Sequence, residues 1–250
     1  MRSPFRQTAA VAAAAVLTVG LSACESEGSG ESPADDTLDT VKSWEKPCEA
    51  FGDFAGFAEF TGFQGLSDGT AAIDDELLDY GSSCSAETVV SEYPGVSPSP
   101  DAEIRVSVWA DADPEDLKAR YDNMKGQSED YVAQQDDAKV VEVPLGNDSH
   151  QVGLVGTESS WDEPASNTTF LNVLFDDWML NVEVRLGRDS LASKAAASEN
   201  AGVLEEQEWY DGGSAEDYSS YSFTYDEFAD WLAATWAPAF TERIEGLLAE

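Results

Sequence analysis

The sequence has few basic residues and one histidine, and each shortage argues against a class of function. Thirteen Lys and Arg residues face 50 Asp and Glu residues, which gives a formal net charge of −37 at pH 7. Binding to nucleic acid needs a basic face that contacts phosphates, so nucleic acid is not expected as a partner. The single histidine, His150, cannot build a zinc or iron site that requires several imidazole ligands.

Motifs of common catalytic sites are also scarce. There is no Cys-x-x-Cys pair and no glycine-rich phosphate loop. Ser43 and Lys46 match Ser-x-x-Lys, but the companion motifs of that enzyme class are missing. His150 follows Ser149 directly, and neighbours in a strand point to opposite faces, so we expect a turn or surface histidine. We therefore predict no catalytic residue, no cofactor and no metal site.

The N-terminus has the pattern of an export signal. Arg2 and Arg6 are the only charged residues before Glu25, and Thr8–Gly20 is an apolar run too short to span a membrane. Leu21-Ser22-Ala23-Cys24 resembles the bacterial lipobox, which implies acylation of the Cys24 thiol and removal of residues 1–23. An ordinary signal peptide with a chance cysteine is the alternative.

The two remaining cysteines suit an exported protein. If Cys24 carries lipid, Cys48 and Cys84 are left, and an oxidising compartment favours a disulfide between them. Closing this loop would stabilise the fold by about 4 kcal/mol. Two buried free thiols are the alternative.

The body of the chain is predicted to follow an acidic tether. Residues 24–42, which are rich in Gly, Ser, Glu and Asp, are expected to be a lipidated cysteine and a disordered tether that reaches roughly 20–25 Å. Residues 43–250 are expected to form one globular domain. Removal of Arg2 and Arg6 leaves 11 basic residues against 50 acidic ones, a net charge of −39. The acidity serves either solubility or the capture of cations.

Hydrophobic periodicity predicts an α+β fold. The patterns indicate strands at 103–110, 139–145 and 151–158, and a hairpin formed by 169–175 and 178–186. Helices are expected over 47–58, from Pro114, over 191–200, and from Phe228 to Leu248 with a kink at Pro238. We predict a single domain in which an antiparallel sheet packs against N- and C-terminal helices.

Two surface segments suggest binding. The segment 205–225 is read as a long acidic loop, and its aromatic residues suit cationic ligands or protein partners. Alternatively, these side chains fold back onto the domain. The candidates are Trp209, Tyr210, Tyr218 and Tyr221. Asp111, Asp113, Glu115 and Asp116 resemble part of a calcium loop, but acids at a helix N-terminus are also typical of capping, which we favour.

Several landmarks together resemble a family of actinobacterial lipoproteins known only as a domain of unknown function. They are the lipobox, the polar tether, Pro47-Cys48, Cys84-Ser85 some 35 residues later, and Leu145-Gly146-Asn147-Asp148-Ser149 before strands. The resemblance covers about 160 residues and implies a compact α+β domain with a role in the cell envelope. It implies no catalytic residues.

Taken together, these features predict a non-catalytic binding or accessory lipoprotein, held by Cys24 at the outer face of the cell membrane. Its partner would be an envelope protein or a small ligand. The alternatives are an envelope glycan hydrolase that uses two carboxylates and a calcium-dependent structural protein.

Overall fold

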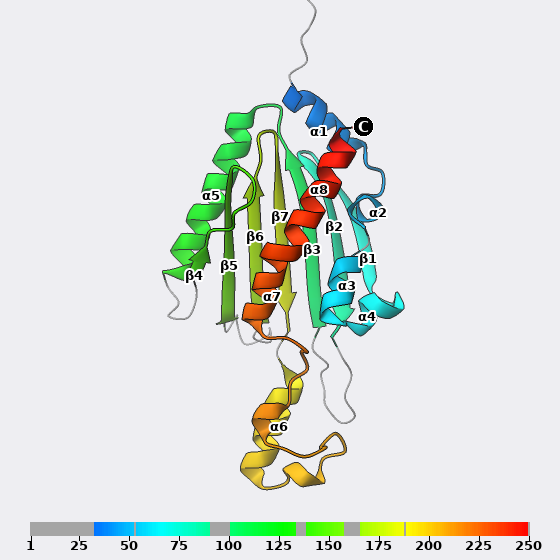
Figure 1. Ribbon diagram of the computed structural model, residues 1–250, viewed down its shortest axis with the longest axis vertical. Coiled ribbons are helices and arrows are strands. Elements are labelled where there is room, and N and C mark those ends of the chain that lie inside the picture. Colours follow the sequence, from blue (N-terminus) through cyan, green and yellow to red (C-terminus); the bar gives the residue numbers. More distant parts are fainter. Residues whose placement is uncertain are drawn as a thin grey trace, which may run out of the picture. The chain divides into compact units, whose positions relative to one another are not determined.

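An antiparallel sheet organises the protein, as the sequence predicts, and it has seven strands (Figure 1). The computed structural model describes residues 33–52, 54–90, 101–133, 139–157, 166–187 and 189–249. The strand order is β1-β2-β3-β7-β6-β5-β4. The strands are β1 (Ala72–Leu78), β2 (Gly81–Val89), β3 (Asp101–Ala110), β4 (Lys139–Val141), β5 (Asp148–Thr157), β6 (Ser166–Leu174) and β7 (Trp178–Leu186). With the surrounding helices they form an α+β domain, and residues 31–250 are one compact unit.

One face of the sheet carries the main hydrophobic core. Strict alternation in the central strands directs apolar side chains to this face, where Val106 of β3 pairs with Val182 of β7 and both are buried. The C-terminal helices cover it through Phe228, Leu232 and Ile244, which are fully buried. These helices are α7 (Tyr225–Trp231), the π-helical turn η3 (Leu232–Trp236) and α8 (Ala237–Leu248). The predicted hairpin of residues 169–186 is confirmed as β6 and β7.

The sequence predicted a kink at Pro238, whereas the structure has a π-helical turn just before this residue. Pro238 is the second residue of α8, which continues without a break from the preceding helical turn. The preceding turn, Leu232–Trp236, is π-helical, which is a recognised way to accommodate an irregularity within a longer helix.

The N-terminal half of the body differs from the prediction in two places. The expected tether is too long, because α1 (Pro33–Ser43) is helical and packs on the sheet with Ala34 and Val41 buried. The Ser82 hydroxyl donates to the Val41 carbonyl over 2.7 Å. The few apolar residues of this polar segment recur at helical spacing, and their burial against the sheet stabilises a helix that would be marginal on its own.

The expected helix over 47–58 is divided into short pieces. They are α2 (Pro47–Phe51), α3 (Ala55–Thr61) and α4 (Gln64–Asp68). Gly52 and Gly62 end the first two with positive φ, and Phe54 between them also has a φ of 57°. These breaks let phenylalanines at three-residue spacing reach one core, since Phe51, Phe54, Phe57 and Phe63 are all buried. The hairpin of β1 and β2 was not predicted.

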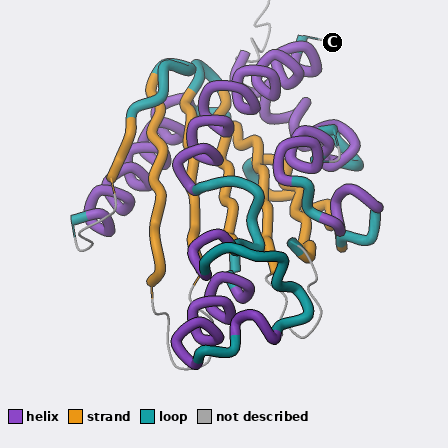
Figure 2. The backbone as a smooth tube through the Cα atoms, turned by 60° about the horizontal axis from the view of Figure 1, so that its bottom comes forward, coloured by secondary structure: helices purple, strands orange, loops and turns teal. Residues whose placement is uncertain are grey.

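A single long helix covers part of the second face. α5 (Pro114–Val132) starts where the sequence predicts, and Leu117 and Tyr121 pack on Leu174 and Met179. Figure 2 shows α5 and the C-terminal helices on opposite sides of the sheet. Strand β4 is shorter than the predicted 139–145, whereas β5 starts earlier than 151.

Candidate functional site

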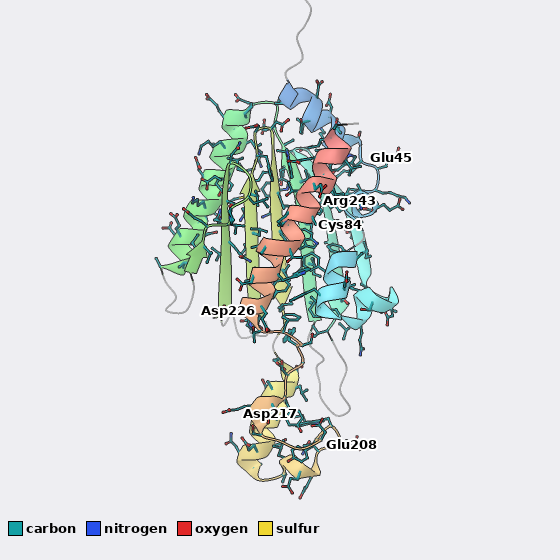
Figure 3. The ribbon with its side chains drawn as sticks, viewed as in Figure 1. Glu45, Cys84, Glu208, Asp217, Asp226 and Arg243 are labelled. Atoms are coloured by element: carbon teal, nitrogen blue, oxygen red, sulfur yellow. A yellow bond between two sulfur atoms is a disulfide. The ribbon has the colours of Figure 1, made fainter. Side chains whose placement is uncertain are left out.

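The acidic aromatic segment belongs to a small structured region rather than a loop. We call residues 189–220 the acidic lobe; it contains α6 (Ser190–Ala201) and the 3-10 turns η1 (Leu204–Glu206) and η2 (Ala215–Asp217). Ala195, Leu204 and Ala215 form its buried cluster, which is separate from the main core. Figure 3 shows its side chains, with Glu208 and Asp217 labelled.

Three of the four predicted aromatic residues come together on the lobe. Trp209 and Tyr218 meet edge to face with ring centroids 5.1 Å apart, and Tyr210 lies 6.0 Å from Tyr218. All three pack on the lobe cluster while remaining half-buried. The buried indole Nε1 of Trp209 has no hydrogen-bond partner within the described part of the chain. The aromatic residues therefore fold back onto the lobe and still present part of each ring to solvent.

Hydrogen bonds fix the position of Tyr218. Its hydroxyl donates to Asp211 Oδ1 over 2.8 Å and accepts from the Asp211 amide over 3.0 Å. Desolvation, together with the neighbouring Asp211 carboxylate, raises the pKa of Tyr218 above its ordinary value. The ring is thus held neutral, in one orientation, beside a carboxylate.

Tyr221 is not part of this surface, so its assignment is corrected. Its side chain is buried, its hydroxyl donates to the Gly187 carbonyl over 2.6 Å, and its ring packs near Phe63 and Phe223. The sequence could not separate Tyr221 from Tyr218, because both lie in the same polar, aromatic stretch. Tyr221 belongs to the main core.

One carboxylate joins the two chain connections of the lobe. Asp189 caps α6 by accepting from the Ala192 amide over 2.9 Å. It also accepts from the Ser219 hydroxyl over 2.6 Å and from the Ser220 amide over 2.9 Å. Asp189 therefore links the entry and the exit of the lobe, a role that sequence analysis missed although Asp before an alanine-rich helix is a typical capping signal.

The lobe is strongly acidic. Within residues 189–220 there are eight acidic residues and one basic residue, Lys194. Four of the acids flank Trp209 and Tyr210 and are exposed: Glu205, Glu206, Glu208 and Asp211. A cation near these rings would be attracted both by the negative carboxylates and by the partly negative faces of the aromatic rings.

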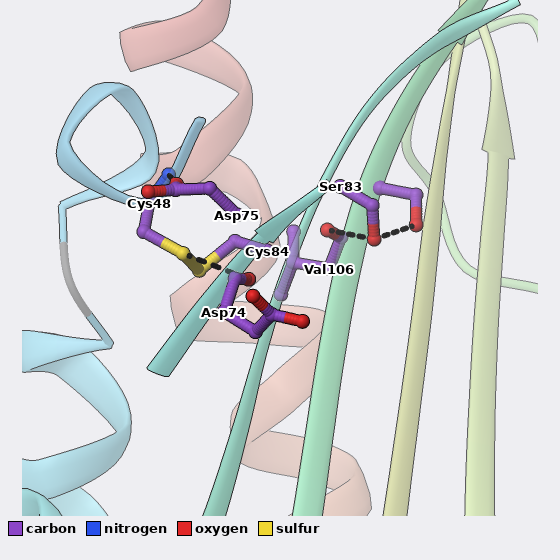
Figure 4. Close-up of a disulfide and its surroundings, with 7 residues drawn as sticks. Cys48, Asp74, Asp75, Ser83, Cys84 and Val106 are labelled. Carbon is purple, nitrogen blue, oxygen red and sulfur yellow. Dashed lines mark hydrogen bonds between the residues drawn. A yellow bond between two sulfur atoms is a disulfide. The ribbon is translucent and has the colours of Figure 1, made fainter. Parts of the chain in front are cut away.

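The structure contains the predicted disulfide between Cys48 and Cys84 (Figure 4). Cys48 lies in α2 and Cys84 in β2, and both are buried. The Cys48 amide also donates to Asp75 Oδ1 over 2.7 Å. The bond therefore ties the N-terminal helices to the outer strands of the sheet, which is a structural role.

His150 is fully buried, which corrects the expectation of a turn or surface residue. It lies in β5 beneath α5, where its Nδ1 is 3.1 Å from the Tyr121 hydroxyl and its Nε2 is 3.2 Å from Asn172 Nδ2. Asn181 Nδ2 donates to Asn172 Oδ1 over 2.7 Å, which orients the Asn172 amide nitrogen toward His150. The imidazole is then neutral, with its proton on Nδ1.

This histidine ends a row of buried polar residues that crosses five strands in register. The row consists of His150, Asn172, Asn181, Ser107 and Ser83. Burial, followed by the positive charge of Lys125, lowers the pKa of His150 to about 4, although Asp148 opposes the shift. His150 has no exposed surface, so a substrate cannot reach its imidazole in this structure. We therefore assign the row a structural role.

The sequence contains one Gly-x-Ser-x-Gly pattern, Gly65–Gly69. A nucleophile elbow of this kind joins a strand to a helix. Here the pattern lies in the short helix α4 and the residue after it, following α3, and Ser67 is exposed. The only histidine of the sequence, His150, lies on the face of the sheet covered by α5, whereas Gly65 contacts Thr88 on the other face. The pattern therefore cannot form a Ser-His pair in this fold.

The acids at residues 111–116 cap a helix, as the capping interpretation predicts. Asp113 Oδ1 accepts from the Glu115 amide over 2.8 Å, and Asp111 Oδ1 accepts from the Asp113 amide over 3.2 Å. Arg120 lies 3.7 Å from the second oxygen of Asp111. Across the described ranges, no three His, Cys, Asp or Glu side chains are grouped so as to hold a metal ion.

The four carboxyl groups whose pKa is shifted all have a lowered pKa, whereas a glycosidase general acid requires a raised one. Hydrogen bonds from Thr70, Ser214 and Thr224 lower the pKa values of Asp68, Asp217 and Glu227 respectively. Burial alone would raise the pKa of Asp148, but Lys125 and Tyr121 lower it. The Ser43 hydroxyl donates to the Thr40 carbonyl, and Lys46 forms an ion pair with Glu49.

Comparison with protein-family models, with curated proteins and with solved structures gave no match. The resemblance to an actinobacterial lipoprotein family thus remains a prediction. Cys24 and the proposed signal lie outside the described residues, so lipidation also remains a prediction. No helix within the described ranges is long and apolar enough to cross a membrane.

Proposed function

We propose that this protein is a lipid-anchored, non-catalytic binding or accessory protein at the outer face of the cell membrane. We further propose that the acidic lobe is the surface that recognises its partner. The observation that carries the proposal is the half-buried group of Trp209, Tyr210 and Tyr218, surrounded by exposed carboxylates on a lobe with its own small core.

The chemistry of the lobe favours a cationic partner. Lys and Arg side chains bind over Trp and Tyr faces, and aromatic residues are enriched at the centres of protein interfaces. The rings are already oriented, because Tyr218 is hydrogen-bonded and Trp209 packs against it. A partner with a basic segment would therefore bind without a large ordering cost in this protein.

The anchor is tested by the fate of the full chain in a bacterial host. Wild-type protein should incorporate labelled palmitate and fractionate with the membrane. A Cys24→Ser variant should incorporate none and lose membrane association, while Ser22→Ala, which keeps a small residue in the lipobox, should behave as wild type. Labelling of Cys24→Ser at the wild-type level would disprove acylation at Cys24.

The lobe is tested by quantitative affinity capture of the anchored protein after cross-linking in living cells. We would compare wild type with a Glu205→Gln, Glu206→Gln, Glu208→Gln variant. The matched control is Glu129→Gln, Glu242→Gln, Glu245→Gln, which removes the same charge from exposed sites on α5 and α8. We expect the amount of the principal partner captured to fall at least tenfold for the lobe variant and to stay unchanged for the control. Equal losses from both variants would show that net charge, and not the lobe, determines binding.

A further inference from the structure

The two edge strands of the sheet, β4 and β1, differ in length and in exposure. β4 has three residues, and shortening is a usual way to protect an edge strand from pairing with other chains. β1 has seven residues and no proline, and residues 72–77 are all exposed. In the described ranges, β1 pairs only with β2, so its outer edge presents unpaired backbone N–H and C=O groups.

On the side of β1 that faces α2, two large apolar side chains are exposed, at positions where edge strands usually carry charged residues. Ile73 is 46% exposed and Leu77 is 55% exposed; within the described ranges, Val141 is the only other large apolar residue that is exposed. Asp75 lies between them, and its carboxylate already accepts from the Cys48 amide. Asp75 pairs with Cys84 of β2, so the disulfide holds this part of the edge in place (Figure 4). The edge is therefore both apolar and preorganised.

The opposite side of β1 is acidic. Asp74 and Glu76 are exposed, and neither forms an ion pair with another described residue. A strand added beside β1 would therefore need apolar residues on one of its faces and basic residues on the other. Residues opposite Ile73 and Leu77 would be apolar, and residues opposite Asp74 and Glu76 would be basic.

We propose that the edge of β1 binds an extended segment of a partner protein in which apolar and basic residues alternate, by addition of a strand to the sheet. A second copy of this chain fits poorly. The antiparallel register that matches Ile73 with Leu77 also places Asp74 opposite Glu76 and Asp75 opposite itself, and directly opposed like charges are destabilising. This surface is separate from the acidic lobe and does not depend on the function proposed for the lobe.

The test uses the purified full chain and the synthetic peptide Lys-Val-Lys-Thr-Lys-Val-Lys, with binding followed by fluorescence anisotropy at low salt. Only alternate N–H groups of an added strand point toward the sheet. We therefore use two N-methylated peptides, one modified at the lysines and one at the residues between them. One should lose at least tenfold in affinity, and the other less than twofold.

Charge variants locate the site. Asp74→Lys with Glu76→Lys should weaken binding at least tenfold. The matched control, Glu129→Lys with Glu242→Lys, makes the same net change on α5 and α8 and should weaken it by less than threefold. Amide hydrogen exchange of residues 72–78 should slow when the peptide binds, because their outward N–H groups become hydrogen-bonded.

Four results would overturn the proposal. The first is absence of peptide binding at low salt. The second is equal binding of both N-methylated peptides and the parent, which would mean attraction by charge alone. The third is exchange protection in residues 199–218 instead of 72–78, which would assign the peptide to the lobe. The fourth is a dimer in sedimentation that Ile73→Lys with Leu77→Lys abolishes, which would make a second copy the occupant.

Discussion

The body and the acidic lobe are stabilised in different ways. In the body, large side chains such as Phe57, Phe228 and Leu180 are completely buried against the sheet. In the lobe, the buried cluster has three small or medium residues, and much of the order comes from hydrogen bonds to Asp189 and Asp211. Regions with few buried apolar contacts open more easily than the core. We therefore expect the lobe to open at a lower free energy than the body, although its aromatic rings are oriented in the folded state.

The largest expected effect lies in the body. Phe228→Ala removes a buried ring that contacts Phe57, Phe223 and Trp231, so it should lower the free energy of unfolding by about 3–5 kcal/mol. Denaturant unfolding measures this change. Glu242→Ala on the exposed side of α8 is the control and should change stability by less than about 0.5 kcal/mol. A similar loss in both variants would contradict this location of the core.

Removal of the disulfide should cause the next largest loss of stability. Replacing Cys48 and Cys84 together by serine should lower the free energy of unfolding by about 2–5 kcal/mol, because the unfolded chain is no longer constrained. The loss should equal that caused by a reductant in the wild-type protein. Insensitivity of the wild-type protein to reductant would show that the bond does not form in solution.

His150 should make the body sensitive to acid. Its folded pKa of about 4 lies below the ordinary value of 6.5, so the unfolded state binds a proton more readily between these values. Stability from this residue is complete above pH 6.5, falls as the pH drops toward 4, and levels below that. The total change is about 3 kcal/mol. Protonated Nε2 would also face the amide nitrogen of Asn172, which is itself a donor.

Other carboxyl groups titrate over part of this range, so the measurement is a difference. Unfolding free energies of wild type and His150→Gln are compared from pH 7 to pH 4. The stability of the wild type should fall more steeply than that of the variant. Parallel curves would contradict the burial of a neutral histidine.

The smallest effect is expected in the lobe. Asp189→Asn keeps the shape of the side chain but weakens three hydrogen bonds, which should cost about 1–2 kcal/mol locally. Hydrogen exchange should accelerate in α6 while the amides of β3 and β7 keep their wild-type protection. Equal acceleration in α6 and the central strands would mean that lobe and body unfold as one unit.

The sequence predicted the regular parts of the fold better than the parts that depend on distant contacts. The alternation in β3 and β7 and the capping signal before α5 are local, and all three elements were found where expected. β1 was missed because its sequence is acidic and its side chains are exposed, so no pattern of burial marks it. α1 was assigned to the tether because its helix depends on packing against the sheet.

The candidate site was predicted only in composition. Local sequence gave the aromatic and acidic content of residues 205–225, but not which rings meet. Trp209, Tyr210 and Tyr218 come together because α6 and η2 share a small core, whereas Tyr221 is drawn into the body by contacts with Phe63 and Gly187. His150 shows the same limit, since the polar partners that allow its burial lie on three other elements.

Site-specific photo-cross-linking in living cells tests the division between body and lobe most directly. A photoreactive side chain would replace Glu206 on the lobe or Glu242 on α8, both of which are exposed. We expect one prominent adduct from position 206, which is lost when Glu205 and Glu208 are also changed to Gln, and no such adduct from position 242. The same adduct from both positions, or an adduct from 242 alone, would contradict the assignment of recognition to the acidic lobe.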